Sequence, residues 1–197
     1  MEKLKAAEGL VVQQKKEWAE ILTGFETKNK YAVLDTLGQQ LYLAAEESSV
    51  IARLFLKTLR PFTMHILSAE GRPVINGVKP FRFYFHEIMV FNSNEKLLGS
   101  VKREFSILTK QLTVKDVQGG VLYNILASML HPWTFKILKD GAEQGEIVKN
   151  WSGLAKEAFT DADNFSVRFP QGADAEQKAV LLGALFLVDI IYFENKG

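Results

Sequence analysis

The stretch KAVLLGALFLVDIIYFE, residues 178–194, decides the fold of this 197-residue chain. Asp174 precedes it, and Gln177 follows three positions later, a pattern like the capping box of a helix N-terminus. Residues 179–193 contain a single polar side chain, that of Asp189. A helix of this length covers roughly 22 Å, whereas the hydrocarbon core of a bilayer is about 30 Å thick.

Two interpretations of this helix remain open. As a membrane segment it is short, and Asp189 adds a cost of about 2.5–3.5 kcal/mol at mid-membrane. As a core helix it is apolar on every side because protein surrounds it, and Gly183 and Ala184 would permit close approach of neighbouring strands. We expect the core helix, over residues 175–193. Its buried side chains are then Leu182, Leu185, Phe186, Val188 and Asp189.

The chain upstream has the pattern of an all-β protein. Short apolar runs alternate with turn signals such as Gly119–Gly120 and Asp140–Gly141, at a spacing of roughly 8–12 residues. The expected strands form five hairpins, over 30–35 and 39–46, 62–69 and 72–78, 81–91 and 96–105, 111–117 and 121–127, and 133–140 and 145–151, with one more strand at 164–169. A closed antiparallel β-barrel around the C-terminal helix would satisfy both halves of the sequence, because the barrel needs filling and the helix needs burial.

The first 19 residues show a helical spacing instead. Leu4, Ala7, Val11 and Trp18 recur at steps of three, four or seven, with Lys and Glu between them. We expect an amphipathic helix over 1–19 that is separate from a barrel domain over 20–197. It either docks on that domain or lies on a membrane surface or a partner. The segment has no apolar core like that of a signal peptide, so we expect a protein that is not secreted.

Composition excludes several function classes. Lys and Arg number 24 against 23 Asp and Glu, so the chain lacks the basic excess that favours nucleic-acid binding. It has no Cys, which excludes disulfides, thiolate metal sites and lipid attachment through a thiol. No phosphate-binding loop, dinucleotide fingerprint or nucleophile motif is present, and the three His lack metal-like spacing. We therefore do not expect an enzyme.

Several segments together resemble the phospholipid scramblase family. They are EILTGFETKNKYAV (20–33), RPFT (60–63), GEIVKNWSG (145–153), EAFTDADNFSVRFP (157–170) and the C-terminal stretch. The resemblance implies a tubby-like fold, a twelve-stranded β-barrel around a C-terminal helix. It also implies a cytoplasmic, membrane-associated protein with calcium-activated, ATP-independent movement of phospholipids between leaflets. The alternative is a tubby-like module that binds lipid headgroups or a protein and moves nothing.

The segment DADNFSVRFPQG (161–172) matches the place that the resemblance assigns to calcium. Asp161, Asp163 and Asn164 supply hard oxygen donors, as Ca²⁺ requires. The segment departs from an EF-hand loop, since Gly172 stands where a bidentate Glu would be. It is either a weak calcium site or a polar turn before the last strand.

The segment KPFRFYFHE (79–87) stands where animal members carry lipid-modified cysteines. In a strand, Phe81, Phe83 and Phe85 would share one face and Arg82 the other. The segment is either a half-buried strand with its Phe side chains inward, or an aromatic and cationic surface for lipid. With Trp18, these four residues are the candidate contacts to a phospholipid membrane, the expected partner, while a protein partner or self-association stays open.

Overall fold

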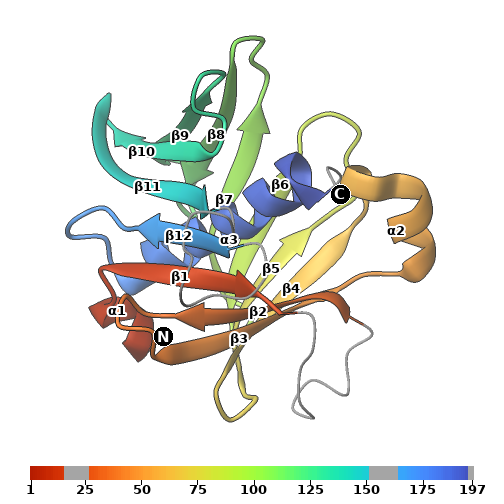
Figure 1. Cartoon of the computed structure of the whole chain (residues 1–197), viewed down its shortest axis with the longest axis vertical. Coiled ribbons are helices and arrows are strands. Elements are labelled where there is room, and N and C mark those ends of the chain that lie inside the picture. The colour runs from red at the N-terminus through yellow and green to blue at the C-terminus, as the bar shows by residue number, and fades with distance from the viewer. Residues whose placement is uncertain (16–26, 151–163, 195–197) are drawn as a thin grey trace.

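The computed structural model describes residues 1–15, 27–150 and 164–194, and the description below covers these residues. Twelve strands form a closed antiparallel barrel around a long helix (Figure 1). The strands are β1 (Gly9–Gln14), β2 (Thr27–Leu34), β3 (Gln40–Glu47), β4 (Phe62–Ser68), β5 (Pro73–Lys79), β6 (Glu87–Asn92), β7 (Leu97–Glu104), β8 (Thr109–Lys115), β9 (Val121–Ser128), β10 (Thr134–Lys139), β11 (Ala142–Asn150) and β12 (Asn164–Arg168). Each strand pairs with the next along the chain, and β1 closes the ring by pairing with β12. The expected tubby-like barrel is confirmed.

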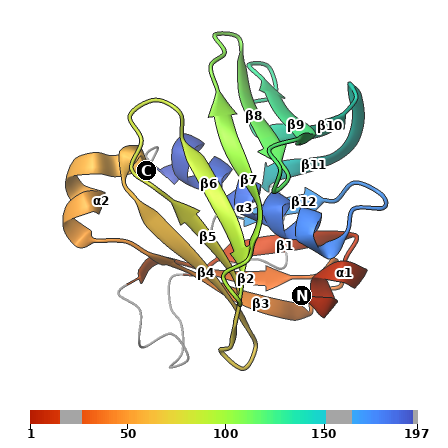
Figure 2. The same cartoon turned by 180° about the vertical axis from the view of Figure 1, so that it is seen from behind.

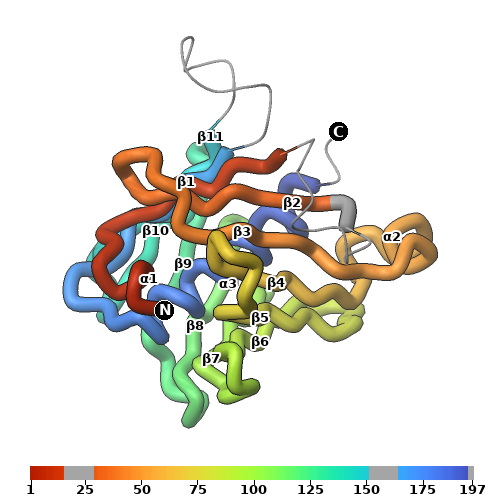
Figure 3. The backbone as a smooth tube through the Cα atoms, turned by 90° about the horizontal axis from the view of Figure 1, so that it is seen from below, coloured from red at the N-terminus to blue at the C-terminus, as the bar shows by residue number. Residues whose placement is uncertain are grey.

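The C-terminal helix α3 (Ala175–Tyr192) fills this barrel. The Gln177 amide donates to the Asp174 carboxylate at 2.8 Å, as the capping pattern predicts. Residues 178–190 are buried without a break, including Leu182, Leu185, Phe186 and Val188, so the prediction of a core helix is confirmed. Figure 3 shows α3 running inside the ring of strands.

Two details explain how an apolar helix fits this closely. A side chain at Gly183 would place its Cβ 2.6 Å from Val90 of β6, so the absent side chain allows helix and wall to touch. Asp189 is buried, and its carboxylate accepts a hydrogen bond from the Tyr31 hydroxyl at 2.7 Å. This bond offsets part of the cost of burying a charge. Among the described residues, none of the helices combines the length and the apolar character that a membrane crossing needs.

The N-terminal helix is much shorter than predicted. Helix α1 (Glu2–Ala6) ends after five residues, and the next segment is β1, a wall strand between β12 and β2. Leu10 and Val12 of β1 are buried in the core, so the barrel begins at Gly9 and not at residue 20. The apolar run Leu10–Val12 favours a strand, and the helical spacing through it was misleading. Trp18 lies outside the described residues.

Helix α1 packs against the first turn of α3. Leu4 is buried, and the Lys178 ammonium donates to the carbonyls of Lys5 and Ala7, each at 2.8 Å. These bonds satisfy carbonyls at the C-terminal end of α1, which a five-residue helix cannot satisfy itself. The N-terminal segment is therefore part of the barrel fold. A variant that lacks residues 1–19 would lose β1 together with its pairings to both neighbours.

Candidate functional site

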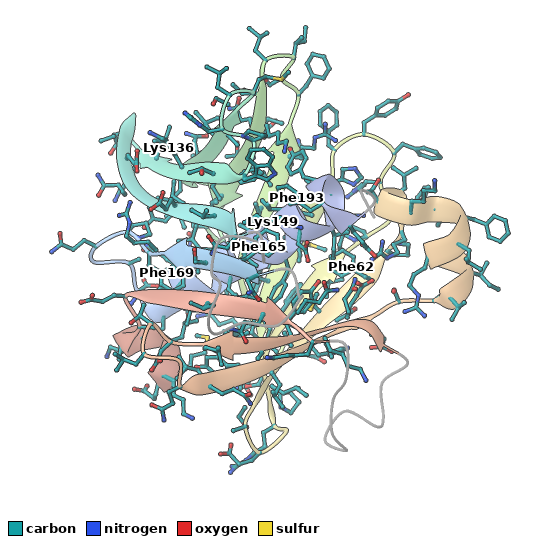
Figure 4. The ribbon with its side chains drawn as sticks, in the orientation of Figure 1. Phe62, Lys136, Lys149, Phe165, Phe169 and Phe193 are labelled. Carbon is teal, nitrogen blue, oxygen red and sulfur yellow. The ribbon has the colours of Figure 1, made fainter. Side chains whose placement is uncertain are left out.

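The two ends of the barrel are built differently. Connections between strands that follow one another along the chain alternate between the ends (Figures 1 and 2). We call one end the rim end; its described connections are 48–61, 80–86, 105–108 and 129–133. We call the other the turn end; its connections are 35–39, 69–72, 93–96, 116–120, 140–141 and 169–174. The last turn of α3 lies toward the rim end, near α2 (Figure 1), and Figure 4 labels Phe193 there.

The aromatic segment at the rim end is a loop and not a strand. Strand β5 ends at Lys79, Pro80 follows, and β6 begins only at Glu87, so the expected strand over 81–91 is wrong in its first half. Proline cannot donate to a strand ladder, which explains why pairing stops there. Phe81, Phe83 and Phe85 are all exposed, so the interpretation that they face the core is wrong as well.

This loop presents aromatic rings and cations together. Tyr84 is 82% exposed, and the rings of Phe81 and Phe83 contact edge to face, with centroids 4.8 Å apart. The Lys102 ammonium of β7 lies 5.1 Å from the centroid of the Phe85 ring, and Arg82 is exposed. The structure therefore brings the predicted residues Phe81, Arg82, Phe83 and Phe85 together as one surface.

Three further connections of the rim end also expose apolar side chains. The β3–β4 connection contains α2 (Val50–Leu56) and a 3₁₀ turn, η2 (Lys57–Leu59), and none of the residues of α2 is buried. The exposed apolar side chains outside the aromatic loop are Val50, Ile51, Leu54 and Phe55 of α2, Phe105, Ile107 and Leu108 before β8, and Met129, Leu130 and Trp133 before β10. Figure 4 shows such side chains projecting outward from α2 and from the upper loops.

A buried ionic cluster supports the rim end from below. The Arg60 guanidinium, 1% exposed, donates to Glu46 at 2.8 and 2.9 Å and to Glu194 at 2.6 Å. The Asn29 amide also donates to Glu46, at 2.6 Å. Burial alone lowers the pKa of Arg60, but the charges of Glu46 and Glu194 outweigh it and raise that pKa. The cluster ties the end of the β3–β4 connection to β3 and to the residue that follows α3.

Lys79 and His86 flank the aromatic loop, and both are buried. The Lys79 ammonium donates to the Arg60 carbonyl at 2.8 Å, which connects the loop to the ionic cluster. Burial, with the nearby Arg60 charge, lowers the pKa of Lys79 to about 8. Burial, with the charges of Lys79 and Arg103, lowers the pKa of His86 to about 4. His86 is therefore neutral near pH 7, and Nδ1 of its ring has no hydrogen-bond partner among the described residues.

Cations also surround the last turn of α3. The Lys149 ammonium lies 4.5 Å from the centroid of Phe193, and the Lys110 ammonium lies 4.9 Å from the same ring (Figure 4 labels Lys149 and Phe193). The Arg103 guanidinium carbon lies 5.5 Å from the centroid of the Tyr192 ring. Cations at this position complement the partial negative charge of a helix C-terminus. Lys110, Lys149 and Arg103 therefore place positive charge beneath the apolar loops of the rim end.

Of the three predicted calcium ligands, the structure describes only Asn164. Asp161 and Asp163 lie outside the described residues, and Asn164 is the first residue of β12, opposite Gln13 of β1 and Asn150 of β11. Within the described ranges, no group of three or more His, Asp or Glu side chains could hold a metal ion. Asn164 supplies one amide oxygen, whereas Ca²⁺ takes six to eight oxygen ligands. The described residues do not by themselves fit a calcium site.

Sequence reasoning identified one of the four apolar connections of the rim end. The α2 segment and the loops at 105–108 and 129–133 were missed because each contributes only a few apolar residues. A usable signal exists in hindsight, since none of the four connections contains an Asp or a Glu. Apolar residues in acid-free loops are unusual on a solvated surface, where single exposed apolar side chains are normal but contiguous patches are not.

Comparison with known proteins gives one consistent family. The family model described as Scramblase matches residues 1–195. Phospholipid scramblase 1 of Mus musculus is 36% identical over 100% of this chain and 64% of its own length. Phospholipid scramblase 2 of Bos taurus is 35% identical over 98% and 71%, and phospholipid scramblase 1 of Homo sapiens is 33% identical over 100% and 66%. The chain thus spans about two thirds of the length of these curated relatives.

A solved structure shares the fold. The X-ray structure of a protein from Arabidopsis thaliana superposes with a TM-score of 0.53 at 18% identity, covering 95% of each chain. At that identity the likeness concerns the architecture of barrel and helix.

Proposed function

The chain belongs to the phospholipid scramblase family, and from this premise we propose that it moves phospholipids between the two leaflets of a bilayer, in both directions and without ATP. The names of its relatives supply the substrate class, phospholipids. The observation that carries the proposal for this chain is the exposed aromatic loop at 80–86, where five successive residues, 81–85, are exposed and four of them are aromatic. Such a loop costs solubility unless an apolar phase receives it.

The lipid path that we propose lies outside the barrel. Helix α3 fills the interior, and the side chains of residues 178–190 are buried against the wall, so no lipid can pass through the barrel. The protein would act from the bilayer surface, by contacts that disturb lipid packing. It would be a peripheral protein of the cytoplasmic side, and the reaction would make or break no covalent bond.

The filled interior also favours a second candidate function. A barrel without a lipid path could bind membranes and move nothing, as a tubby-like module that recognises lipid headgroups or a protein. The two candidates share the membrane surface and differ in lipid movement, so one assay separates them.

The assay uses liposomes with a fluorescent phospholipid in both leaflets and a membrane-impermeant quencher outside. Transport predicts that the protein lets the quencher destroy the signal of the inner leaflet as well. A module that only binds would sediment with the vesicles and leave that signal intact. Leakage is controlled with an enclosed water-soluble dye, which must stay protected. Sedimentation with unchanged inner-leaflet signal would exclude transport.

Calcium is the cofactor that we propose, held weakly by Asp161, Asp163 and Asn164. Three oxygen donors leave several ligand positions for water, and Gly172 supplies no carboxylate at the end of the segment. Titration calorimetry should give an affinity weaker than about 10⁻⁶ M, the range of sensor sites. Lipid movement should fall when a chelator is added and in the double variant Asp161→Asn, Asp163→Asn. Equal rates with calcium and with chelator would remove calcium from the account.

A further inference from the structure

We propose that the whole rim end, and not the aromatic loop alone, is a docking surface for an anionic phospholipid bilayer; this rests on the membrane location in the proposed function. Three connections that the sequence alone did not mark as lipid contacts would enter the bilayer together with the aromatic loop. They are α2, the β7–β8 loop at 105–108 and the β9–β10 loop at 129–133. The proposal fixes the orientation of the barrel, with the C-terminal end of α3 toward the membrane and α1 away from it.

The first observation is where the exposed apolar side chains lie. Of the seventeen large apolar side chains exposed in the described residues, fourteen belong to the four rim connections. The other three are Leu37, Val117 and Val121. A random scatter of surface apolar residues would not favour one end, because single exposed apolar side chains occur all over soluble proteins.

The second observation is that the four connections are neighbours. They join β3 to β4, β5 to β6, β7 to β8 and β9 to β10, and these eight strands follow one another around the wall. Their tips therefore form a continuous arc of the rim. In Figure 1 the β7–β8 loop is at the top, the β5–β6 loop lies beside it, and α2 lies to the right. One flat partner can contact all of them.

The third observation is charge. The four rim connections contain no acid, and their bases outside the buried ionic cluster of Arg60 are Arg53, Lys57 and Arg82. The nearest acids in sequence are Glu47 and Glu104, which end β3 and β7, and Glu87, which begins β6. The turn end is the reverse, because its six connections contain six acids and two bases. An anionic surface would attract the four described rim connections and repel the described turns of the opposite end, with each exposed basic residue near it adding about 1 kcal/mol of attraction.

The chemistry of the tips selects a bilayer over a protein partner. The rings of Tyr84 and Trp133 have a polar atom on an apolar body, which suits the headgroup region. The Lys102 ammonium stacked on Phe85 combines a cation and a ring in one contact. Four separate tips on one rim need a partner that accommodates any spacing between them, and a fluid lipid surface does so without a matching shape.

The absence of Cys from the chain gives a clean test. A cysteine introduced in full-length protein as Ile107→Cys, 80% exposed in the rim end, would carry an environment-sensitive fluorophore. The matched control is Leu37→Cys, 91% exposed in the turn end. Both side chains are aliphatic and exposed, so both variants should fold. Vesicles contain phosphatidylcholine with or without phosphatidylserine, and a chelator is present to remove calcium.

The proposal predicts a blue shift at position 107 on phosphatidylserine vesicles and no shift at position 37. It also predicts that Ile107→Asp weakens vesicle binding about tenfold, since one large apolar side chain leaves the apolar phase. Leu37→Asp should bind as wild type. Binding with no response at 107, equal responses at both positions, or no binding at all would overturn the docking surface. A shift at 107 in a protein that fails the lipid-movement assay would leave the surface standing and remove transport.

Discussion

The rim end and the turn end close the same barrel by different means. At the turn end, Asp35, Asn92 and Asp116 each accept hydrogen bonds from two backbone amides of their own turn, at 2.7–3.0 Å. At the rim end the connections are longer on the whole, their side chains are apolar, and buried ions anchor their bases. Turns that satisfy their own polar groups need no partner, whereas exposed apolar loops do. The turn end therefore satisfies its own polar groups, while the rim end leaves apolar side chains exposed, which is why we propose it as the contact surface.

We expect the largest effect from a substitution in α3, because both ends of the barrel depend on this helix. Leu182→Asp places an unpaired charge in the middle of α3, where the side chain is wholly buried. The cost should be about 5 kcal/mol or more, comparable to the whole stability of many domains, so the variant should be unfolded. Chemical denaturation followed by circular dichroism measures this. Leu182→Met, which keeps the volume, should cost less than about 1.5 kcal/mol. A folded Leu182→Asp protein would contradict the enclosed helix.

A smaller effect should separate the two ends directly. Arg60→Met leaves Glu46 and Glu194 buried without their cation, which should cost about 3–5 kcal/mol. Arg168→Met, near the turn end, removes ion pairs to Glu143 and Glu146 that are 3.5 Å long and exposed. That loss should be about 0–1 kcal/mol. Equal losses in the two variants, measured as unfolding free energies, would refute the view that buried ions anchor the rim end.

A third effect concerns the loss of folding stability in acid, to which His86 of the rim end should contribute. The pKa of His86 is about 4 in the folded protein and near 6.5 when unfolded, because burial and the charges of Lys79 and Arg103 disfavour its cation. Below pH 6.5 the unfolded chain therefore binds a proton that the folded protein refuses, so this contribution to stability is present above pH 6.5 and is lost as pH falls toward 4. The loss should reach about 1–3 kcal/mol.

His86→Phe should remove that part of the pH dependence. Unfolding free energies measured between pH 7 and pH 4 would fall less steeply in the variant than in wild type. His131→Phe, at an exposed position of the same end, should keep the wild-type slope. If the two variants show the same slope, His86 is not the group responsible.

Local signals allowed much of the barrel to be predicted from sequence. Turn residues such as Asp140–Gly141, with positive φ at both positions, and the cap at Asp174 act over a few residues, and the structure contains both. The predicted helix was wrong over residues 9–14 because a short apolar run fits either a helix or a strand. Only the pairing with β2 and β12 decides between them. The predicted strand was wrong over residues 81–85. Aromatic and other side chains alternate there as in a strand, but Pro80 ends the pairing.

The rim end could not be predicted as a unit. Its apolar residues come from four connections that are separated by strand pairs, and only barrel closure makes them neighbours. The ionic cluster beneath it joins residues as distant in sequence as Arg60 and Glu194. The burial of Asp189 was predicted, but its hydrogen bond from the Tyr31 hydroxyl was not, because Tyr31 lies in another part of the sequence.

In the orientation that we propose, the rim end faces the bilayer and the turn end faces away. Hydrogen exchange of backbone amides, measured by mass spectrometry with and without phosphatidylserine vesicles, tests it on the unmodified protein. When vesicles are bound, we predict slower exchange in residues 50–60, 81–86, 105–108 and 129–133. We predict unchanged exchange in 35–39, 93–96 and 116–120. Protection of those turns, or vesicle binding that leaves the four rim segments unprotected, would contradict it.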